Sequence, residues 1–433
     1  MSNKKFMLKC IMALMFCLTG LVSCGDKVPA NEIHYTTIDN SVLPIEDLFY
    51  FGEGRIVSNS YVPDKNVCIL KLDKDVTEIQ YSAFKGCSSL TSISIPPSVT
   101  KIGWGAFEGC SSLTSISIPE SVTEIGDYAF DDCSNLTFIT LPESLTEIGE
   151  MFFYNCRLKS ISIPESVTKI GDRAFFGCKS LTSITIPPSV TEIGHAAFYG
   201  CKSLTHVEGP VFIIQELPKG QLASFVISEG ETNIGEYAFS GCKSLTSISI
   251  PPSVTKIGHD AFSYCSSLTS ISIPPSVTEI GSSAFSGCSS LTSISIPPSV
   301  TKIGNWAFSR CSSLTSITIP ESVTEIGSYA FSGCSSLTSI TIPESVTEIG
   351  GEAFSGCSSL TSISIPESVK KIKYYAFFCC SSLTNISIPS SVAKIESGAF
   401  SGCSSLTEVR IPKGCYVDDT AFEDCPNVQI IRY

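Results

Sequence analysis

The sequence predicts a β-rich solenoid of about 17 rungs, and three observations support that prediction. A block of about 23 residues, close to S-V-T-x-I-G-x-x-A-F-x-x-C-S-S-L-T-S-I-x-I-P, recurs from residue 76 to the end of the chain. A cysteine marks the same place in almost every copy, and the apolar residues of each copy alternate in short runs. One copy buries too little to fold alone, so we expect consecutive copies to stack and share a continuous core.

Each element of one repeat follows from its residues. Residues 90–95 (Leu-Thr-Ser-Ile-Ser-Ile) alternate between apolar and polar, which predicts a strand with one buried face. Pro96 lacks an N–H group and ends that strand. Residues 99–102 predict a second short strand on the opposite wall, and Gly103 supplies a turn. At Phe107 we expect a short helical or 3₁₀ corner that directs the ring into the interior.

The period is interrupted between Cys201 and Cys242, where the interval is longer than elsewhere. We interpret the intervening stretch as one shortened, irregular rung with a local loop at 211–218. Residues 67–72 and 428–433 fit the strand pattern before and after the complete repeats. The predicted divisions are a signal peptide (1–24), a tether (25–33), an N-terminal β cap (34–75), repeats (76–205), the irregular repeat (206–235) and repeats to the C-terminus (236–433).

The N-terminus has the features of an export signal. Three lysines lie within the first nine residues, and the apolar stretch 11–18 is too short to span a bilayer as a mature helix. Residues 21–24 (Leu-Val-Ser-Cys) resemble a bacterial lipobox, which is cut before the cysteine so that Cys24 becomes the lipid-bearing N-terminus. We therefore predict an exported protein, anchored by lipid at the outer membrane or cell surface. The alternatives are a signal-anchor helix and a chance apolar start.

Charge and cysteine content restrict the partners and the chemistry. The formal charge of −13 disfavours nucleic acid and anionic lipid, and the scattered acids do not resemble a calcium loop. Most of the 21 cysteines share one repeat position, where stacked side chains point the same way and have poor disulfide geometry. We predict a buried ladder of thiols that donate weakly to turn carbonyls, with disulfides or metal binding as alternatives. Cys68, Cys379 and Cys415 lie off this ladder.

Catalytic motifs are not apparent in the sequence. The four histidines have no metal-ligand spacing such as H-E-x-x-H. An S-x-x-K motif at 98–101 recurs in other copies and becomes S-V-T-E at 121–124, so it is part of the repeat pattern. The adjacent carboxylates of Asp131 and Asp132 are explained by a solvated turn. We predict no enzymatic activity, no cofactor and no metal site.

The run Leu-x-x-Ile-x-Ile-Pro-x-x-Val-x-x-Ile-Gly-x-x-Ala-Phe-x-x-Cys, as at 268–288, resembles the BspA-type (Treponema pallidum-type) leucine-rich repeat. The resemblance covers about residues 67–433. It implies a right-handed leucine-rich-repeat superhelix with a parallel sheet on one wall. Together with the lipobox, it resembles surface lipoproteins of Bacteroides-like bacteria. Members of that family are associated with adhesion to host matrix proteins or epithelial cells and with coaggregation of bacteria.

Sequence variation concentrates in the residue pairs that flank Ala-Phe, and we expect these pairs to line one edge of the solenoid. Exposed Tyr, Trp and Arg side chains are typical of binding interfaces, although unconstrained turn residues would also vary. The candidate ligand-binding residues are Trp104, Tyr128, Tyr154, Arg173, Tyr199, Tyr237, Tyr264, Trp306, Arg310, Tyr329, Tyr374 and Tyr375.

The expected partners are host matrix or cell-surface proteins, or other bacterial surfaces, with the membrane reached only through the lipid anchor. Many equivalent rungs would give avidity toward repetitive ligands. The alternatives are a glycan-binding or nutrient-capture accessory lipoprotein and a structural surface spacer.

Overall fold

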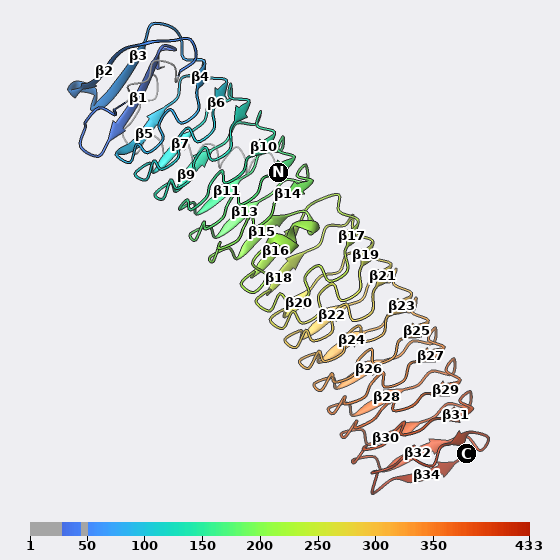
Figure 1. Ribbon diagram of the computed structural model, residues 1–433. Coiled ribbons are helices and arrows are strands. Elements are labelled where there is room, and N and C mark those ends of the chain that lie inside the picture. Colours follow the sequence, from blue (N-terminus) through green and yellow to red (C-terminus); the bar gives the residue numbers. More distant parts are fainter. Residues whose placement is uncertain (1–27, 45–50) are drawn as a thin grey trace. The chain divides into compact units, whose positions relative to one another are not determined.

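The computed structural model describes residues 28–44 and 51–433. The predicted signal peptide, the lipidation site Cys24 and the start of the tether lie outside the described residues. The chain divides into two compact units, Met1–Cys156 and Arg157–Tyr433. Within each unit, short strands stack as the rungs of a β-solenoid (Figure 1). About 15 turns are present, with almost no helix.

The first unit combines an antiparallel meander with the first parallel rungs. Its strands are β1 (Glu32–Thr37), β2 (Ile56–Val62), β3 (Val67–Leu72), β4 (Glu78–Ile79), β5 (Leu90–Ser94), β6 (Lys101–Ile102), β7 (Ser115–Ser117), β8 (Glu124–Ile125), β9 (Phe138–Thr140) and β10 (Glu147–Ile148). One sheet has the order β2-β3-β1-β5-β7-β9, and a second has the order β4-β6-β8.

A strand is present at 67–72 as predicted, but it is not a rung of the solenoid, although the count of about 17 rungs includes it. This segment forms β3, which pairs antiparallel with β1 and β2, and β1 lies between β3 and the first parallel strand, β5. Apolar alternation identifies a strand with one buried face but does not identify its neighbours, because parallel and antiparallel strands share the same side-chain period. The solenoid therefore has fewer rungs than the sequence predicted.

The second unit consists of two strand walls. The first wall contains β11 (Ser160–Ser162), β13 (Ser183–Thr185), β15 (His206–Gly209), β16 (Ser224–Ile227), β18 (Ser247–Ser249), β20 (Ser270–Ile271), β22 (Ser293–Ser295), β24 (Ser316–Thr318), β26 (Ser339–Thr341), β28 (Ser362–Ser364), β30 (Asn385–Ser387), β32 (Glu408–Ile411) and β34 (Gln429–Arg432). The second wall contains β12 (Lys169–Ile170), β14 (Glu192–Ile193), β17 (Asn233–Ile234), β19 (Lys256–Ile257), β21 (Glu279–Ile280), β23 (Lys302–Ile303), β25 (Glu325–Ile326), β27 (Glu348–Ile349), β29 (Lys371–Ile372), β31 (Lys394–Ile395) and β33 (Tyr416–Val417).

Most neighbouring strands on each wall pair in parallel, with equivalent residues in register. Ile271 of β20, for example, lies opposite Ile294 of β22, and Ile257 of β19 lies opposite Ile280 of β21. The sequence prediction of a parallel β-solenoid is confirmed.

The corners that contain Ala-Phe are turns, so the predicted helical or 3₁₀ corners are wrong. In the described part of the chain, the 3₁₀ helices are η1 (Pro63–Lys65) and η2 (Val211–Glu216). Two residues of almost every corner have left-handed backbone, as at Ser283 (φ 57°) and Gly287 (φ 75°), which helical geometry does not allow. The corner also bonds to the next rung, where the Phe285 N–H donates to the Ala307 carbonyl at 2.8 Å.

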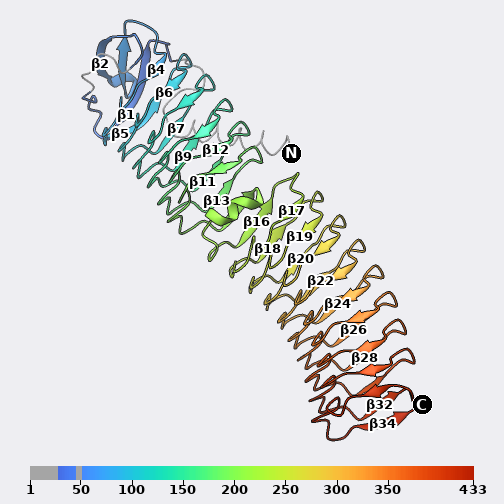
Figure 2. The same ribbon diagram turned by 45° about the vertical axis from the view of Figure 1, so that its right-hand side comes forward.

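The irregular stretch between Cys201 and Cys242 contains a helix where we predicted a loop. The 3₁₀ helix η2 is visible beside β16 in Figure 2, and it buries Val211, Ile213 and Ile214. Strands β15 and β16 pair in parallel on the first wall, so the sheet continues past the short repeat. The helix thus occupies the part of this rung where other rungs form a second-wall strand.

The interior consists of columns of identical side chains. The rings of Phe285 and Phe308 are parallel to within 3°, their centroids are 5.5 Å apart, and both side chains are fully buried. Beside them, the Cys288 thiol donates to the Phe262 carbonyl of the preceding rung at 3.2 Å. All described cysteines are free thiols, so the predicted ladder of buried thiols is confirmed.

The three cysteines outside the ladder have separate surroundings. Cys68 is buried in the N-terminal meander and donates to the Ser41 carbonyl at 3.5 Å. Cys415 is buried near the C-terminus and donates to the Tyr416 carbonyl at 3.5 Å. Cys379 is half-buried and occupies a left-handed turn position (φ 55°) that most rungs fill with glycine.

Candidate binding edge

One tight turn per rung builds the candidate site. In the rung that begins with β23, Gly304 follows the strand, and a Cβ placed there would lie 2.9 Å from the backbone nitrogen of Ser282 in the preceding rung. Glycine therefore lets consecutive rungs approach closely at this corner. Ala307 and Phe308 are then fully buried, while Trp306 before them is exposed. We call the residue pairs that flank Ala-Phe in all rungs the turn edge.

All twelve candidate residues lie on the turn edge, and most of them are exposed. Tyr199, Tyr237 and Tyr264 are the most accessible rings of the set, at 67%, 51% and 54% exposure. The other exposed members are Trp104, Arg173, Trp306, Arg310, Tyr374 and Tyr375, and the half-buried members are Tyr128, Tyr154 and Tyr329. Their location is established by the fold; their ligand-binding role stays a prediction.

Many of these large side chains stand on left-handed backbone. Positive φ values occur at Tyr128, Arg173, Tyr237, Tyr264, Trp306, Arg310, Tyr329 and Tyr375. Most rungs have glycine at the residue before the ladder cysteine, such as Gly287 and Gly333, because glycine adopts this conformation without steric cost. Tyr264 and Arg310 occupy that same place with φ values of 59° and 58°. A bulky residue there is strained by about 1–2 kcal/mol.

In the second unit, contacts with neighbouring rungs orient three of the candidate rings. Trp306 and Tyr329 meet edge to face with centroids 4.4 Å apart, and the Tyr329 hydroxyl donates to Glu352 at 2.6 Å. This hydrogen bond raises the pKa of Tyr329 to about 12. The ring of Tyr374 covers Gly351, where an added Cβ would lie only 2.3 Å from the ring. These rings are therefore held in fixed orientations by their neighbours.

Other candidate residues form separate contacts along the second unit. Tyr199 stacks on Phe176 with centroids 5.1 Å apart, and Tyr237 meets His259 edge to face at 5.5 Å. Tyr375 lies over Gly398. The structure thus arranges the candidate residues of this unit as several small groups.

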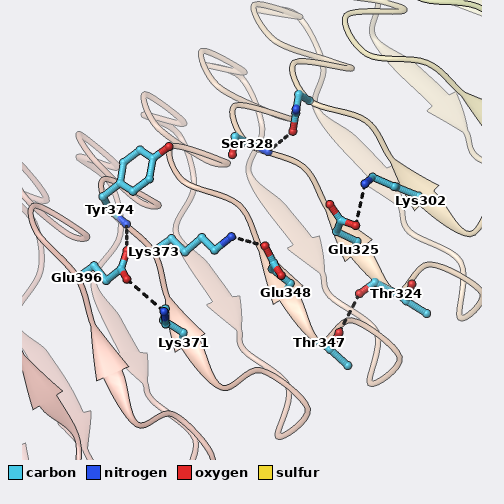
Figure 3. Close-up of polar contacts among 11 residues, drawn as sticks. Lys302, Thr324, Glu325, Ser328, Thr347, Glu348, Lys371, Lys373, Tyr374 and Glu396 are labelled. Atoms are coloured by element: carbon cyan, nitrogen blue, oxygen red, sulfur yellow. Dashed lines mark hydrogen bonds and ion pairs between the residues drawn. The ribbon is translucent and has the colours of Figure 1, made fainter.

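Ion pairs between rungs border the turn edge on the second wall. The Lys302 ammonium lies 2.8 Å from the Glu325 carboxylate, and the Lys371 ammonium lies 3.5 Å from the Glu396 carboxylate (Figure 3). Glu396 also accepts a hydrogen bond from the Tyr374 backbone N–H at 3.1 Å. Exposed pairs of this kind contribute about 0–1 kcal/mol each, so they matter here mainly because they place both signs of charge along this wall.

In the first unit, the turn edge carries a row of three rings, one of which the sequence analysis missed. The Trp104 centroid is 5.1 Å from that of Tyr128 and 6.5 Å from that of Tyr81. Tyr81 was missed because the first repeat has Gln80 in place of the usual glycine. The spacing from Tyr81 to the Ala-Phe pair at 83–84 would have revealed it.

No cluster of three or more His, Cys, Asp or Glu residues within residues 28–44 and 51–433 could hold a metal ion. Over the same ranges, the structure contains no helix with the length and apolar character to span a bilayer.

Comparison with known proteins identifies the repeat. The sequence profile of the BspA type leucine rich repeat region matches residues 55–178, 146–220, 217–338 and 324–433. The chain belongs to the BspA-type leucine-rich repeat family. The leucine-rich repeat solenoid of this family is typically a non-enzymatic scaffold that binds other macromolecules. No curated protein matches the sequence.

Solved structures include several similar BspA-type or leucine-rich repeat proteins. A leucine-rich repeat protein from Bacteroides ovatus is 38% identical, covers 82% of this chain and 88% of its own, and has a TM-score of 0.52. A leucine rich cell surface protein from Faecalibacterium prausnitzii is 25% identical, covers 95% of both chains and has a TM-score of 0.38. The T. pallidum leucine rich repeat protein is 31% identical over 45% of this chain and 73% of its own, with a TM-score of 0.25.

Proposed function

We propose that this BspA-type protein is a non-enzymatic, adhesin-type surface lipoprotein. It is exported, anchored at the outer membrane or cell surface through lipid on Cys24, and binds host matrix or cell-surface proteins, or the surfaces of other bacteria. The turn edge of the second unit provides the contact surface. A relative described as a cell surface protein and the lipobox at 21–24 support the location.

The observation that supports the turn edge most directly is the strain at Tyr264 and Arg310. Glycine fills the equivalent place in most rungs at no steric cost, so drift alone would not favour a bulky residue there. Strained backbone of this kind concentrates at functional sites, where the side chain has a use outside the fold. Tyr, Trp and Arg are also the residue types that contribute most to protein interfaces.

The acidic charge and the repetition of the edge indicate the kind of partner. A formal charge of −13 favours basic partners over acidic ones. Groups of exposed rings recur on separate rungs, so a repetitive ligand can contact several of them at once, and weak contacts sum to appreciable avidity.

Binding by purified chain 25–433 to matrix proteins and to whole bacterial cells tests the proposal. Replacing Trp306, Arg310 and Tyr329 together with alanine should weaken binding at least tenfold, because each of these residue types commonly contributes more than 1 kcal/mol to an interface. Tyr416→Ala is the matched control, because this exposed ring lies on a second-wall strand and is not one of the residues of the turn edge. Undiminished binding by the triple variant, with its fold intact by circular dichroism, would exclude the turn edge.

The anchor is tested separately in cells. Cys24→Ala should move the protein from the membrane fraction to the soluble fraction and abolish incorporation of labelled fatty acid. Labelled fatty acid retained on the variant would refute lipidation at Cys24.

A further inference from the structure

A groove of about 400 Å³ lies in the first unit, along strands β4, β6 and β8. Its lining includes Tyr81 and Trp104, which follow strands β4 and β6, and Glu78, Lys101 and Glu124, which lie on β4, β6 and β8. This groove combines two exposed aromatic rings with charged hydrogen-bonding groups, which is the mixture of surfaces found in small-molecule sites.

Glycine residues let the rungs beside the groove approach one another closely. A Cβ on Gly103 would lie 2.5 Å from the backbone nitrogen of Tyr81, and a Cβ on Gly126 would lie 2.6 Å from that of Trp104. Neither position can accept a side chain without moving the neighbouring rung. These glycines therefore set the close spacing of the turns that carry Tyr81 and Trp104.

The two aromatic rings of the groove are accessible to solvent and are in contact with neighbouring side chains. Tyr81 is 64% exposed and Trp104 is 41% exposed, and their rings are tilted by 45° with centroids 6.5 Å apart. Trp104 also contacts Tyr128, and the Lys85 ammonium lies 5.3 Å from the Trp104 ring. These contacts hold Trp104 in place while leaving part of its surface open. In the sequence, this is the one pair of consecutive rungs with Tyr or Trp at this place.

The charged strand residues of the groove present hydrogen-bond acceptors and a donor in a regular row. Glu78, Lys101 and Glu124 lie opposite one another in the parallel sheet β4-β6-β8, and neighbouring strands are about 4.8 Å apart. The Lys101 ammonium pairs with Glu124 at 2.7 Å. Carboxylates accept hydrogen bonds and an ammonium donates them, so this row can bind several adjacent hydroxyl groups.

We propose that this groove binds a neutral hexopyranose ring of a glycan. The apolar C–H face of the sugar packs on Tyr81 and Trp104, and its hydroxyls donate to Glu78 and Glu124 and accept from Lys101. Asp127 adds a third carboxylate to the lining, so the acidic charges outnumber the single ammonium. This excess disfavours uronic, sialic and sulfated sugars. The inference goes beyond the proposed adhesin function, since it uses the first unit and does not need the turn edge of the second.

The test is direct titration of the purified chain 25–433 with neutral hexose oligosaccharides and with their uronic and sulfated counterparts. The chain has two tryptophans, so in a Trp306→Phe background the fluorescence reports on Trp104 alone. Neutral oligosaccharides should shift this emission saturably, and acidic ones should not. Isothermal titration then gives the affinity of each variant.

Tyr81→Ala should lower the affinity for the neutral sugar about tenfold, which corresponds to one well-placed ring contact. Glu124→Gln, which keeps the side-chain shape, should lower it several-fold. Tyr416→Ala is the matched control, because it removes an exposed ring that also lies near a lysine, Lys394. Circular dichroism confirms the fold of each variant.

Two results would overturn the inference. One is the absence of saturable binding to any neutral sugar, and the other is binding that Tyr81→Ala and Glu124→Gln leave unchanged. Preferential binding of acidic sugars would refute the predicted selectivity. The sugar site contains none of Trp306, Arg310 and Tyr329 of the second unit, so failure of this site and failure of the proposed adhesin surface are distinguishable.

Discussion

Replacing Arg310 with glycine should stabilise the solenoid and weaken binding at the same time. Arg310 has a φ of 58° at a place where Gly333, one rung later, has a φ of 75°. A residue with a Cβ is strained in this conformation, and glycine is not. The side chain is exposed, so little packing is lost when it is removed.

The size of the effect follows from two opposing terms. Relief of the left-handed strain contributes about 1–2 kcal/mol, and the greater freedom of glycine in the unfolded chain subtracts about 0.5–1 kcal/mol. The backbone hydrogen bond from the Arg310 N–H to the Ser332 carbonyl, at 2.7 Å, does not need the side chain. The expected net gain is therefore about 0.5–1 kcal/mol.

Urea unfolding followed by circular dichroism measures this gain as a higher midpoint. Gly241→Ala is the reciprocal control, because it places a Cβ on left-handed backbone (φ 74°) with no other atom within 4 Å and should lower the midpoint. A lower midpoint for Arg310→Gly would mean that the arginine side chain stabilises the fold, and the strain would then be no argument for function. Unchanged binding by the same variant would refute the role of Arg310 in adhesion.

Three further predictions concern the Phe column and the thiol ladder of the second unit and the pH dependence of the first unit. Phe285→Ala leaves a cavity in the stacked Phe column, and it should cost about 3–5 kcal/mol in denaturant unfolding, whereas a loss below about 1 kcal/mol would contradict the packed column. Burial raises the pKa of the Cys288 thiol to about 12, so a thiol-alkylating reagent at mildly alkaline pH should modify Cys288 only after unfolding, as read by mass spectrometry; rapid modification of the folded chain would contradict its burial. Burial, with the Glu108 charge next in effect, raises the pKa of Asp131 to about 6, above its ordinary value of 3.8. The stability that this group supplies is complete below pH 3.8 and is lost as the pH rises through about 6. Asp131→Asn should therefore have the larger free energy of unfolding at neutral pH, and its difference from the parent chain should close on acidification. A difference in unfolding free energy that stays constant across that range would refute the assignment.

The period of the sequence was sufficient to predict the parallel walls, the Phe column and the thiol ladder. Each of these depends on residues that face their own equivalents in the next rung, such as Phe285 against Phe308. A repeat that stacks on itself places equivalent residues together, so one copy describes the neighbours of every copy. Within the repeats, sequence spacing therefore predicts contacts between rungs.

Features outside this repetition were not predictable in the same way. The segment 67–72 has the right alternation for a rung, but its neighbours are the antiparallel strands β1 and β2, whose positions depend on chain connections. The loop predicted at 211–218 contains η2 because its apolar residues reach the interior from a helix in a shortened rung. The ring of Tyr81 was missed because Gln80 breaks the motif that marks the turn.

The hydrogen bonds between rungs explain why the same hydroxyl residues recur along the walls. They also explain why the turn edge is the better candidate for binding. The Thr338 hydroxyl donates to the Thr315 carbonyl one rung earlier at 3.4 Å, and the Ser322 hydroxyl donates to the Val300 carbonyl at 2.6 Å. The recurring hydroxyl residues thus have a structural use in every copy, which accounts for their repetition without any ligand. Bulky residues on left-handed backbone have the opposite property, because the fold alone would favour glycine there. A side chain such as Arg310, which stands where the fold would gain from its removal, is therefore the one on which the proposed binding surface is tested most sharply.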